Sequence, residues 1–389
     1  MITEDKIVRC AESIVDSMNL NKGDSVLISG GIHARDLLEE IYLYCYRTGA
    51  VPMMTYSSDR LVSRVMDQIP AETLSQVPKH RLGATEGMDC QIALEPYDDP
   101  RISTRFPRDK MEARVRSSVP IRKIVHGEDG GDGKKWCYAG WPTKKAADFY
   151  GIDYPLYEKF IIEGMTVPQD DLRSRCEAIA TSLEGADEVL ITDPNGTELQ
   201  LQIGGRRINI DDGFVSDEDY EMNDRGNNLP AGEVFIAPHE TEGSGRIFCP
   251  ITIDRLTGKI IRDVELRVES GELQLEEAEA SENLDALVSS FEQTRKVDEA
   301  TQDTVRTLNV AELGIGCNPK ITKAIGYVLT DEKIIGSAHV AFGSNFSYGG
   351  TSKSSMHWDF VTVPKVTMIA MGDEIEDRVV IDDGRIAGL

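Results

Sequence analysis

Basic residues are scarce in this sequence. Its 389 residues include 42 Lys and Arg against 67 Asp and Glu, which gives a formal net charge of −25 at pH 7. Such a charge repels phosphate backbones and anionic membrane surfaces, so we expect neither nucleic acid nor a membrane as a partner. A bound metal ion, or a substrate with a cationic group such as an α-ammonium, suits this field better, although plain solubility explains the charge equally well.

Long apolar runs and paired cysteines are also missing. No run of about 18 apolar residues occurs, so we expect no transmembrane helix. Residues 1–6 are acidic and amphipathic, without the basic and apolar regions of a signal peptide. The seven cysteines are scattered and form no CxxC pair, so neither a disulfide framework nor a thiolate zinc site is indicated. We therefore expect a location in the reducing cytoplasm.

The apolar pattern that is present predicts an α/β N-terminal domain with a small parallel sheet. Apolar residues recur at helical spacing in 6–18 and 34–48, and the short apolar segments 25–29 and 51–56 have the composition of strands. A strand, a helix and a second strand in this order form a βαβ unit. Such a unit implies parallel strands joined by a right-handed crossover.

The pattern changes near residue 168. After a helix predicted at 170–183, short strands alternate with tight turns, which is typical of an α+β, mostly antiparallel domain. We therefore predict an N-terminal domain of residues 1–167 and a strand-rich C-terminal domain of residues 168–389. Within the first domain we expect a short strand at 123–126. The glycine-rich segment 128–133 is expected to be a solvated turn, because it lacks the spacing of a phosphate loop.

Histidine is rare, with six residues, and two of them stand in an informative context. His357 and Asp359 are separated by one residue in an apolar segment, and alternate residues of a strand share a face. The pair therefore makes half of a metal site. His339, which has glycines nearby, is a candidate third ligand. Taken alone, two histidines and one aspartate are a weak indication of a metal site.

Two acids in unusual surroundings are further candidate ligands. Glu233 follows a Pro/Gly turn at the start of an apolar strand, and Glu312 lies in an apolar segment punctuated by glycine. A buried carboxylate is costly unless it is paired with a cation or bound to a metal. A satisfied salt bridge explains each acid as well as metal binding does, so the residues alone leave the two open.

The order of these motifs resembles the aminopeptidase T/aminopeptidase S family of metallopeptidases over essentially the whole chain. The matching segments are N-L-P-x-x-E-V-F-x-A-P at 228–238, Glu312-Leu-Gly, His339-x-Ala-x-Gly and His357-x-Asp. The resemblance implies an aminopeptidase that releases N-terminal residues from short peptides, and a homodimer. It also implies a co-catalytic pair of divalent ions (Zn, Co or Mn) with five ligands: Glu233, Glu312, His339, His357 and Asp359.

The chain departs from this family at two positions. The peptidases place a Glu five residues before the first His and a Tyr seven residues after it, where this sequence has Ile334 and Phe346. The resemblance implies that this Glu is a general base and that this Tyr is a ligand or an oxyanion donor. Glu332 and Tyr348 are the nearby candidates for these catalytic roles.

Two alternatives remain open at this point. The same fold family resembles the dihydroxypyridine ring-cleaving dioxygenases, in which a single Fe(II) is held by two His and one Asp, and His339, His357 and Asp359 satisfy that set. Glu233 and Glu312 distinguish the peptidase from the dioxygenase, because a metal site that both acids reach is dinuclear and hydrolytic. A non-catalytic metal-binding or assembly protein is the third hypothesis.

Overall fold

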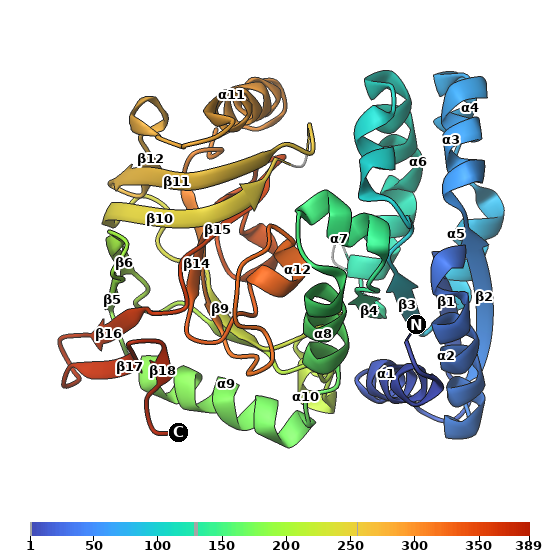
Figure 1. Ribbon diagram of the computed structural model, residues 1–389, viewed down its shortest axis with the longest axis horizontal. Coiled ribbons are helices and arrows are strands. Elements are labelled where there is room, and N and C mark those ends of the chain that lie inside the picture. The colour runs from blue at the N-terminus through green and yellow to red at the C-terminus, as the bar shows by residue number, and fades with distance from the viewer. Residues whose placement is uncertain (1, 128–130, 255) are drawn as a thin grey trace. The chain divides into compact units, whose positions relative to one another are not determined.

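The computed structural model describes residues 2–127, 131–254 and 256–389 (Figure 1). The chain divides into two compact units, each made of two segments. Unit 1 contains Met1–Thr166 and Gly213–Pro230, and unit 2 contains Val167–Asp212 and Ala231–Leu389. The chain therefore returns to unit 1 for one short segment. The predicted single boundary between residues 167 and 168 assigned this segment to the C-terminal domain.

Unit 1 is built on a parallel sheet with strand order β2-β1-β3-β4-β8. Its strands are β1 (Ser25–Gly31), β2 (Val51–Ser57), β3 (Cys90–Leu94), β4 (Lys135–Ala139) and β8 (Gly226–Leu229). Its helices are α1 (Glu4–Asp16), α2 (Arg35–Thr48), α3 (Asp59–Gln68), α4 (Ala71–Leu74), α5 (Lys79–Gly87), α6 (Arg108–His126), α7 (Lys144–Tyr150), α8 (Tyr154–Met165) and α10 (Asp217–Glu221). The predicted βαβ unit is confirmed, since β1 and β2 pair in parallel across α2.

The strand predicted at 123–126 is wrong, because these residues form the last turn of α6. Ile121 and Val125 stand four residues apart and are both buried, which is the spacing of one helix face. The helix ends at Gly127, which adopts a left-handed φ of +65°. The next strand is β4, where alternate residues are buried. The turn predicted at 128–133 falls partly outside the described residues.

Unit 2 contains two antiparallel sheets, with strand orders β12-β11-β10-β6-β5-β16-β17-β18 and β15-β14-β13-β9-β7. The first comprises β5 (Glu188–Thr192), β6 (Glu198–Gln202), β10 (Ser244–Ile253), β11 (Ile260–Glu269), β12 (Glu272–Leu273), β16 (Thr367–Met371), β17 (Arg378–Asp382) and β18 (Arg385–Ile386). The second comprises β7 (Ile208–Asp211), β9 (Glu233–Ile236), β13 (Val310–Gly316), β14 (Ala338–Gly343) and β15 (His357–Val361). The helices are α9 (Gln169–Leu183), α11 (Leu284–Thr301) and α12 (Val328–Asp331), and Figure 1 shows β10 and β11 as a long hairpin.

One face of the five-stranded sheet is apolar and belongs to the core of unit 2. Phe291 of α11 stacks on Trp358 and Phe360 of β15, with ring centroids 5.4 Å and 6.3 Å apart. Leu313 and Val340 are cross-strand partners on the same face and are fully buried. Burial of each such side chain stabilises the fold by about 1.5–3 kcal/mol. Because side chains alternate along a strand, the intervening residues project from the opposite face.

The predicted fold class is confirmed: an α/β N-terminal unit with a small parallel sheet, followed by a strand-rich antiparallel C-terminal unit. None of the helices in the described part of the chain combines the length and the apolar character needed to cross a membrane.

Candidate metal centre

The five predicted metal ligands project from one face of the five-stranded sheet in unit 2. They come from four adjacent strands: His357 and Asp359 from β15, His339 from β14, Glu312 from β13 and Glu233 from β9. Ala341 of β14 lies opposite Asp359 on one side and Glu312 on the other. Cross-strand partners share a face, and so do residues two apart on a strand. The register therefore places all five side chains together.

Glycines on neighbouring positions make room for these side chains. Gly314 lies opposite His339, and a Cβ on Gly314 would lie 2.0 Å from the imidazole Nε2. Gly316 lies opposite Glu233, and a Cβ there would lie 2.1 Å from the carbonyl oxygen of Ile334. The first glycine admits the histidine ring, and the second lets the chain segment around Ile334 pass close to the sheet.

The ligand atoms form two groups that share Glu312. In the first group, His339 Nε2 lies 3.1 Å from Glu312 Oε1 and 3.7 Å from Glu233 Oε2. In the second, His357 Nε2 lies 3.1 Å from Asp359 Oδ1 and 3.7 Å from Glu312 Oε2. The potential ligand atoms of each group lie within 4.8 Å of one another. Glu312 could therefore help to hold an ion in either group.

A hydrogen bond to the backbone fixes the orientation of the His357 ring. Its Nδ1 lies 2.8 Å from the carbonyl oxygen of Ser344, to which it donates a hydrogen bond, so that Nε2 faces the carboxylates. Burial lowers the pKa of His357, but the charge and hydrogen bond of Asp359 outweigh burial and raise the pKa to about 10. In the same way, Glu312 and Glu233 raise the pKa of His339 to about 9 against the effect of burial. Without a metal, the positive charge of each protonated imidazole offsets the negative charge of the neighbouring carboxylates.

One buried atom of the first group fits a cation. Glu233 Oε2 accepts no hydrogen bond among the described residues. Burial raises the pKa of Glu233 to about 8, against the opposing charge of Lys333. Carboxylate oxygens and imidazole nitrogens are the ligands of Zn²⁺ and of Mn²⁺ and Co²⁺ in proteins. The residues present therefore fit a divalent metal centre.

Sequence reasoning missed Lys333, which has no exposed surface. Its ammonium lies 2.6 Å from Glu233 Oε1 and 3.0 Å from Glu332 Oε2. The segment is held by the backbone, since Asn318 N donates to the carbonyl oxygen of Lys333, and Asn318 Nδ2 donates to that of Ala231. In the sequence, Glu332-Lys333 looks like an ordinary surface charge pair, so no signal there indicated burial.

The structure places Glu332 and Tyr348 beside the cluster. The side chain of Glu332 is 16% exposed, and burial raises its pKa against the opposing charge of Lys333. Tyr348 OH lies 3.4 Å from His357 Nδ1, and burial together with the charges of Glu312 and Asp359 raises the pKa of this phenol.

The two residues at the family's Glu and Tyr positions lie elsewhere. Ile334 is fully buried, whereas Phe346 is 58% exposed and stacks under the ammonium of Lys353 at 4.1 Å. Neither has a group able to transfer a proton. Glu332 and Tyr348 are therefore the nearer candidates for those roles.

The loop that carries Tyr348 is held by Glu240. One carboxylate oxygen accepts hydrogen bonds from Asn345 Nδ2 at 3.0 Å and from Thr351 N at 2.6 Å, and the other lies 2.7 Å from Arg206 Nη2. Burial raises the pKa of Glu240, but these hydrogen bonds and the Arg206 charge outweigh it and lower the pKa to about 2.

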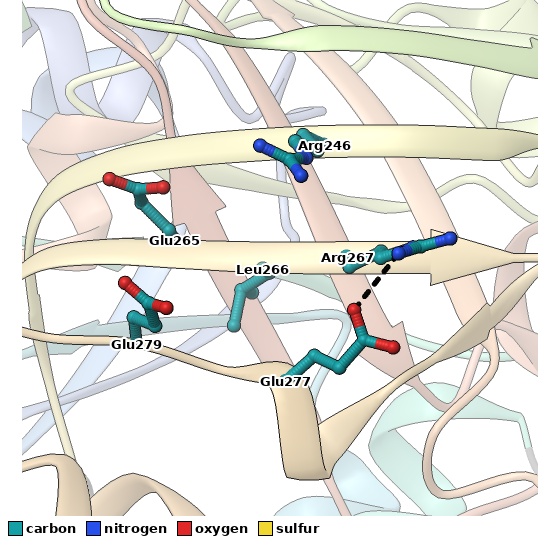
Figure 2. Close-up of a pocket in the computed structure, with 6 residues that line it drawn as sticks. All are labelled: Arg246, Glu265, Leu266, Arg267, Glu277 and Glu279. Atoms are coloured by element: carbon teal, nitrogen blue, oxygen red, sulfur yellow. Dashed lines mark hydrogen bonds and ion pairs between the residues drawn. The ribbon is translucent and has the colours of Figure 1, made fainter.

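A separate pocket lies on strands β10 and β11 and contains none of the predicted site residues (Figure 2). Its lining mixes two arginines with three glutamates and one leucine, and Arg267 pairs with Glu277 at 3.0 Å. Both signs of charge are present and one pair is already satisfied, so the pocket does not favour a ligand of either charge.

Comparisons with known proteins identify the family of the chain. The model of the thermophilic metalloprotease family (M29) matches residues 3–386. Among solved structures, wild-type AmpT from Thermus thermophilus is similar, with a TM-score of 0.75 and 17% identity over 99% of each chain. A 2,5-dihydroxypyridine dioxygenase from Pseudomonas putida KT2440 is also similar, with a TM-score of 0.61 and 12% identity over 100% of this chain and 99% of that one. No curated protein matches the sequence. The family match confirms the metallopeptidase family inferred from the motifs, and the chain belongs to the thermophilic metalloprotease family M29.

Proposed function

We propose that this metalloprotease is an aminopeptidase that releases N-terminal residues from short peptides with two divalent ions bound at the centre. The observation that carries the proposal is the pair of ligand groups that share Glu312. Metal ions bound there would polarise the scissile carbonyl and bind a free amine or an attacking water. Zn²⁺, Co²⁺ and Mn²⁺ all suit the ligand set, and metal identity follows from elemental analysis.

We assign the proton transfers to Glu332 and Tyr348. Glu332 is partly exposed next to the cluster, and its raised pKa makes it a stronger base than an ordinary carboxylate, suited to accept a proton from water. The raised pKa of Tyr348 keeps its hydroxyl protonated, so it can donate a hydrogen bond to the oxyanion that develops on the carbonyl oxygen. His357 is held by Ser344, so the ligand face does not need to reorganise during the reaction.

The geometry supports a hydrolase over the ring-cleaving dioxygenase. A facial-triad iron site needs two histidines and one carboxylate around one ion. Among the described residues, each ligand group contains one histidine and two carboxylates, and Glu233 and Glu312 both take part. Carboxylates in excess of a His-His-Asp set supply the charge for a second divalent ion. For this reason we do not propose iron-dependent ring cleavage.

The test compares Glu332→Gln with the unmodified protein after loading with Zn²⁺, Co²⁺ or Mn²⁺. We expect release of N-terminal residues from short peptides with a free amine and none from the same peptides with an acetylated amine. We expect Glu332→Gln to lower kcat by about 10²–10⁴-fold with unchanged metal content, since a general base contributes this much. Unmodified protein that binds two ions but cleaves no peptide would overturn the proposal.

The quaternary structure and the location stay predictions. The homodimer follows from the resemblance, and the cytoplasmic setting follows from the scattered cysteines, which form no CxxC pair. Sedimentation tests the first of these, because a two-fold dimer has twice the 43.0 kDa chain mass. A 43.0 kDa species at micromolar concentration would contradict it.

A further inference from the structure

Lys333 is a fully buried cation in direct contact with one of the two ligand groups. Its ammonium lies 2.6 Å from Glu233 Oε1, and only Oε2 of that carboxylate faces His339. Glu233 is therefore partly neutralised before any metal arrives. A buried ion pair of this kind is costly to break, since both partners have left water.

The second ligand group has a different environment. Both of its carboxylates face His357, whose Nε2 lies 3.1 Å from Asp359 Oδ1 and 3.7 Å from Glu312 Oε2. Each group contains one histidine, so the ammonium of Lys333 beside Glu233 is the feature that distinguishes the first group from the second. The ammonium of Lys333 coordinates no metal while it is protonated, and its charge repels a cation placed beside Glu233.

We infer that Lys333 is a positioning residue that makes the two metal positions unequal, so that the Glu312–His357–Asp359 group fills first and the Glu233–Glu312–His339 group binds its ion more weakly. The inference rests on the metal-dependent function proposed above. It deepens that proposal, because the second position would then fill and empty with the free metal concentration. Lys333 acts on the metal position through Glu233; because it also pairs with Glu332 at 3.0 Å, the test reads bound metal and not turnover.

The test measures Zn²⁺ binding to the full chain after removal of metal with a chelator, by calorimetric titration and by elemental analysis after equilibrium dialysis. In the unmodified protein we expect one tight ion and a second bound at least about tenfold more weakly. In Lys333→Met, the second ion should bind at least about tenfold more tightly and the first should change little. Two ions of equal affinity in the unmodified protein would overturn the inference.

Two further variants separate charge from folding. Lys333→Met with Glu332→Gln removes one positive and one negative charge together, so it serves if the single variant does not fold, and we expect a tightening in the same direction that is smaller because an attractive charge is lost as well. Lys135→Met is the matched control, because Lys135 is also buried but donates to the carbonyl oxygen of Asn19 in unit 1. An unchanged second affinity in a folded Lys333 variant, or an equal change at both positions, would overturn the inference.

Because the readout is bound metal, it does not depend on activity. Protein that shows the unequal affinities and cleaves no peptide would refute the proposed function and leave the role of Lys333 supported. Protein that cleaves peptides and binds two ions with equal affinity would support the proposed function and refute the role of Lys333.

Discussion

Gly314 and His339 face each other on adjacent antiparallel strands, and the histidine ring occupies the space that a side chain at 314 would fill. The close approach is possible because glycine has no Cβ. The position of His339, a proposed metal ligand, thus depends on the absence of a side chain at residue 314.

Gly314→Ala is expected to weaken metal binding. The added Cβ would lie 2.0 Å from Nε2 of His339, so the ring must move away from Glu312. We expect at least about a tenfold loss of metal affinity and a stability loss of about 1–3 kcal/mol. Gly83→Ala is the control, because a Cβ at this position on α5 meets open space. Metal titration of both variants checks the expectation, and unchanged affinity in Gly314→Ala would contradict the assignment of His339.

His357→Ala is expected to remove the ion of the second ligand group. His357 stands between Asp359 and Glu312, and its replacement takes away the imidazole nitrogen of that group. Metal that binds only the folded state stabilises it by about 2.7 kcal/mol at a concentration 100 times Kd, so the rise in Tm on adding metal should shrink. His80→Ala, at an exposed position, should behave like the unmodified protein. Elemental analysis that finds full metal content in His357→Ala would refute the ligand assignment.

Tyr348→Phe and Phe346→Ala distinguish the two aromatic residues after His339. Tyr348 reaches the cluster through its hydroxyl, whereas Phe346 is 58% exposed. We expect Tyr348→Phe to lower kcat by about a hundredfold with unchanged metal content, because one oxyanion donor is lost. Phe346→Ala should change kcat by less than about twofold, as expected of an exposed residue. Equal effects of the two substitutions would show that the hydroxyl has no special role.

Glu240→Gln is expected to reduce the loss of folding stability that occurs as the pH falls below 4.5. The pKa of Glu240 falls from 4.5 to about 2 on folding, so its stabilising effect is present above pH 4.5 and is lost as the pH falls toward 2. The variant should have a lower Tm at pH 7 and a smaller further loss between pH 4.5 and pH 3 than the unmodified protein. Thermal melts on metal-free protein measure this difference. An identical acid slope in the two proteins would contradict it, and Glu72→Gln, at an exposed position, is the control.

The sequence predicted the parts of the fold and site that depend on local pattern. The period of two in His357-Trp-Asp359 predicted a shared strand face, and Nε2 and Oδ1 of the pair are indeed 3.1 Å apart. The Pro/Gly turn before Glu233 predicted a strand start, and β9 begins at that residue.

The features of the fold and site that the sequence did not predict depend mostly on pairing between distant segments. The shift in register between Val310 and Glu312 places Glu312 opposite Ala341, and no pattern within β13 indicates it. Lys333 contacts Glu233, a residue 100 positions away, and Gly316 leaves room for the neighbouring Ile334. Residues 123–126 continue α6, because Val125 lies one turn after Ile121 on the buried face of the helix.

The four strands that carry the ligands are far apart along the chain, with β9 beginning at Glu233 and β15 at His357. Loop closure over such separations is slow, and no local segment holds a complete ligand group. A complete Glu312–His357–Asp359 group forms only when β13, β14 and β15 have paired. Uptake of an ion by that group during refolding would therefore report the pairing of these three strands.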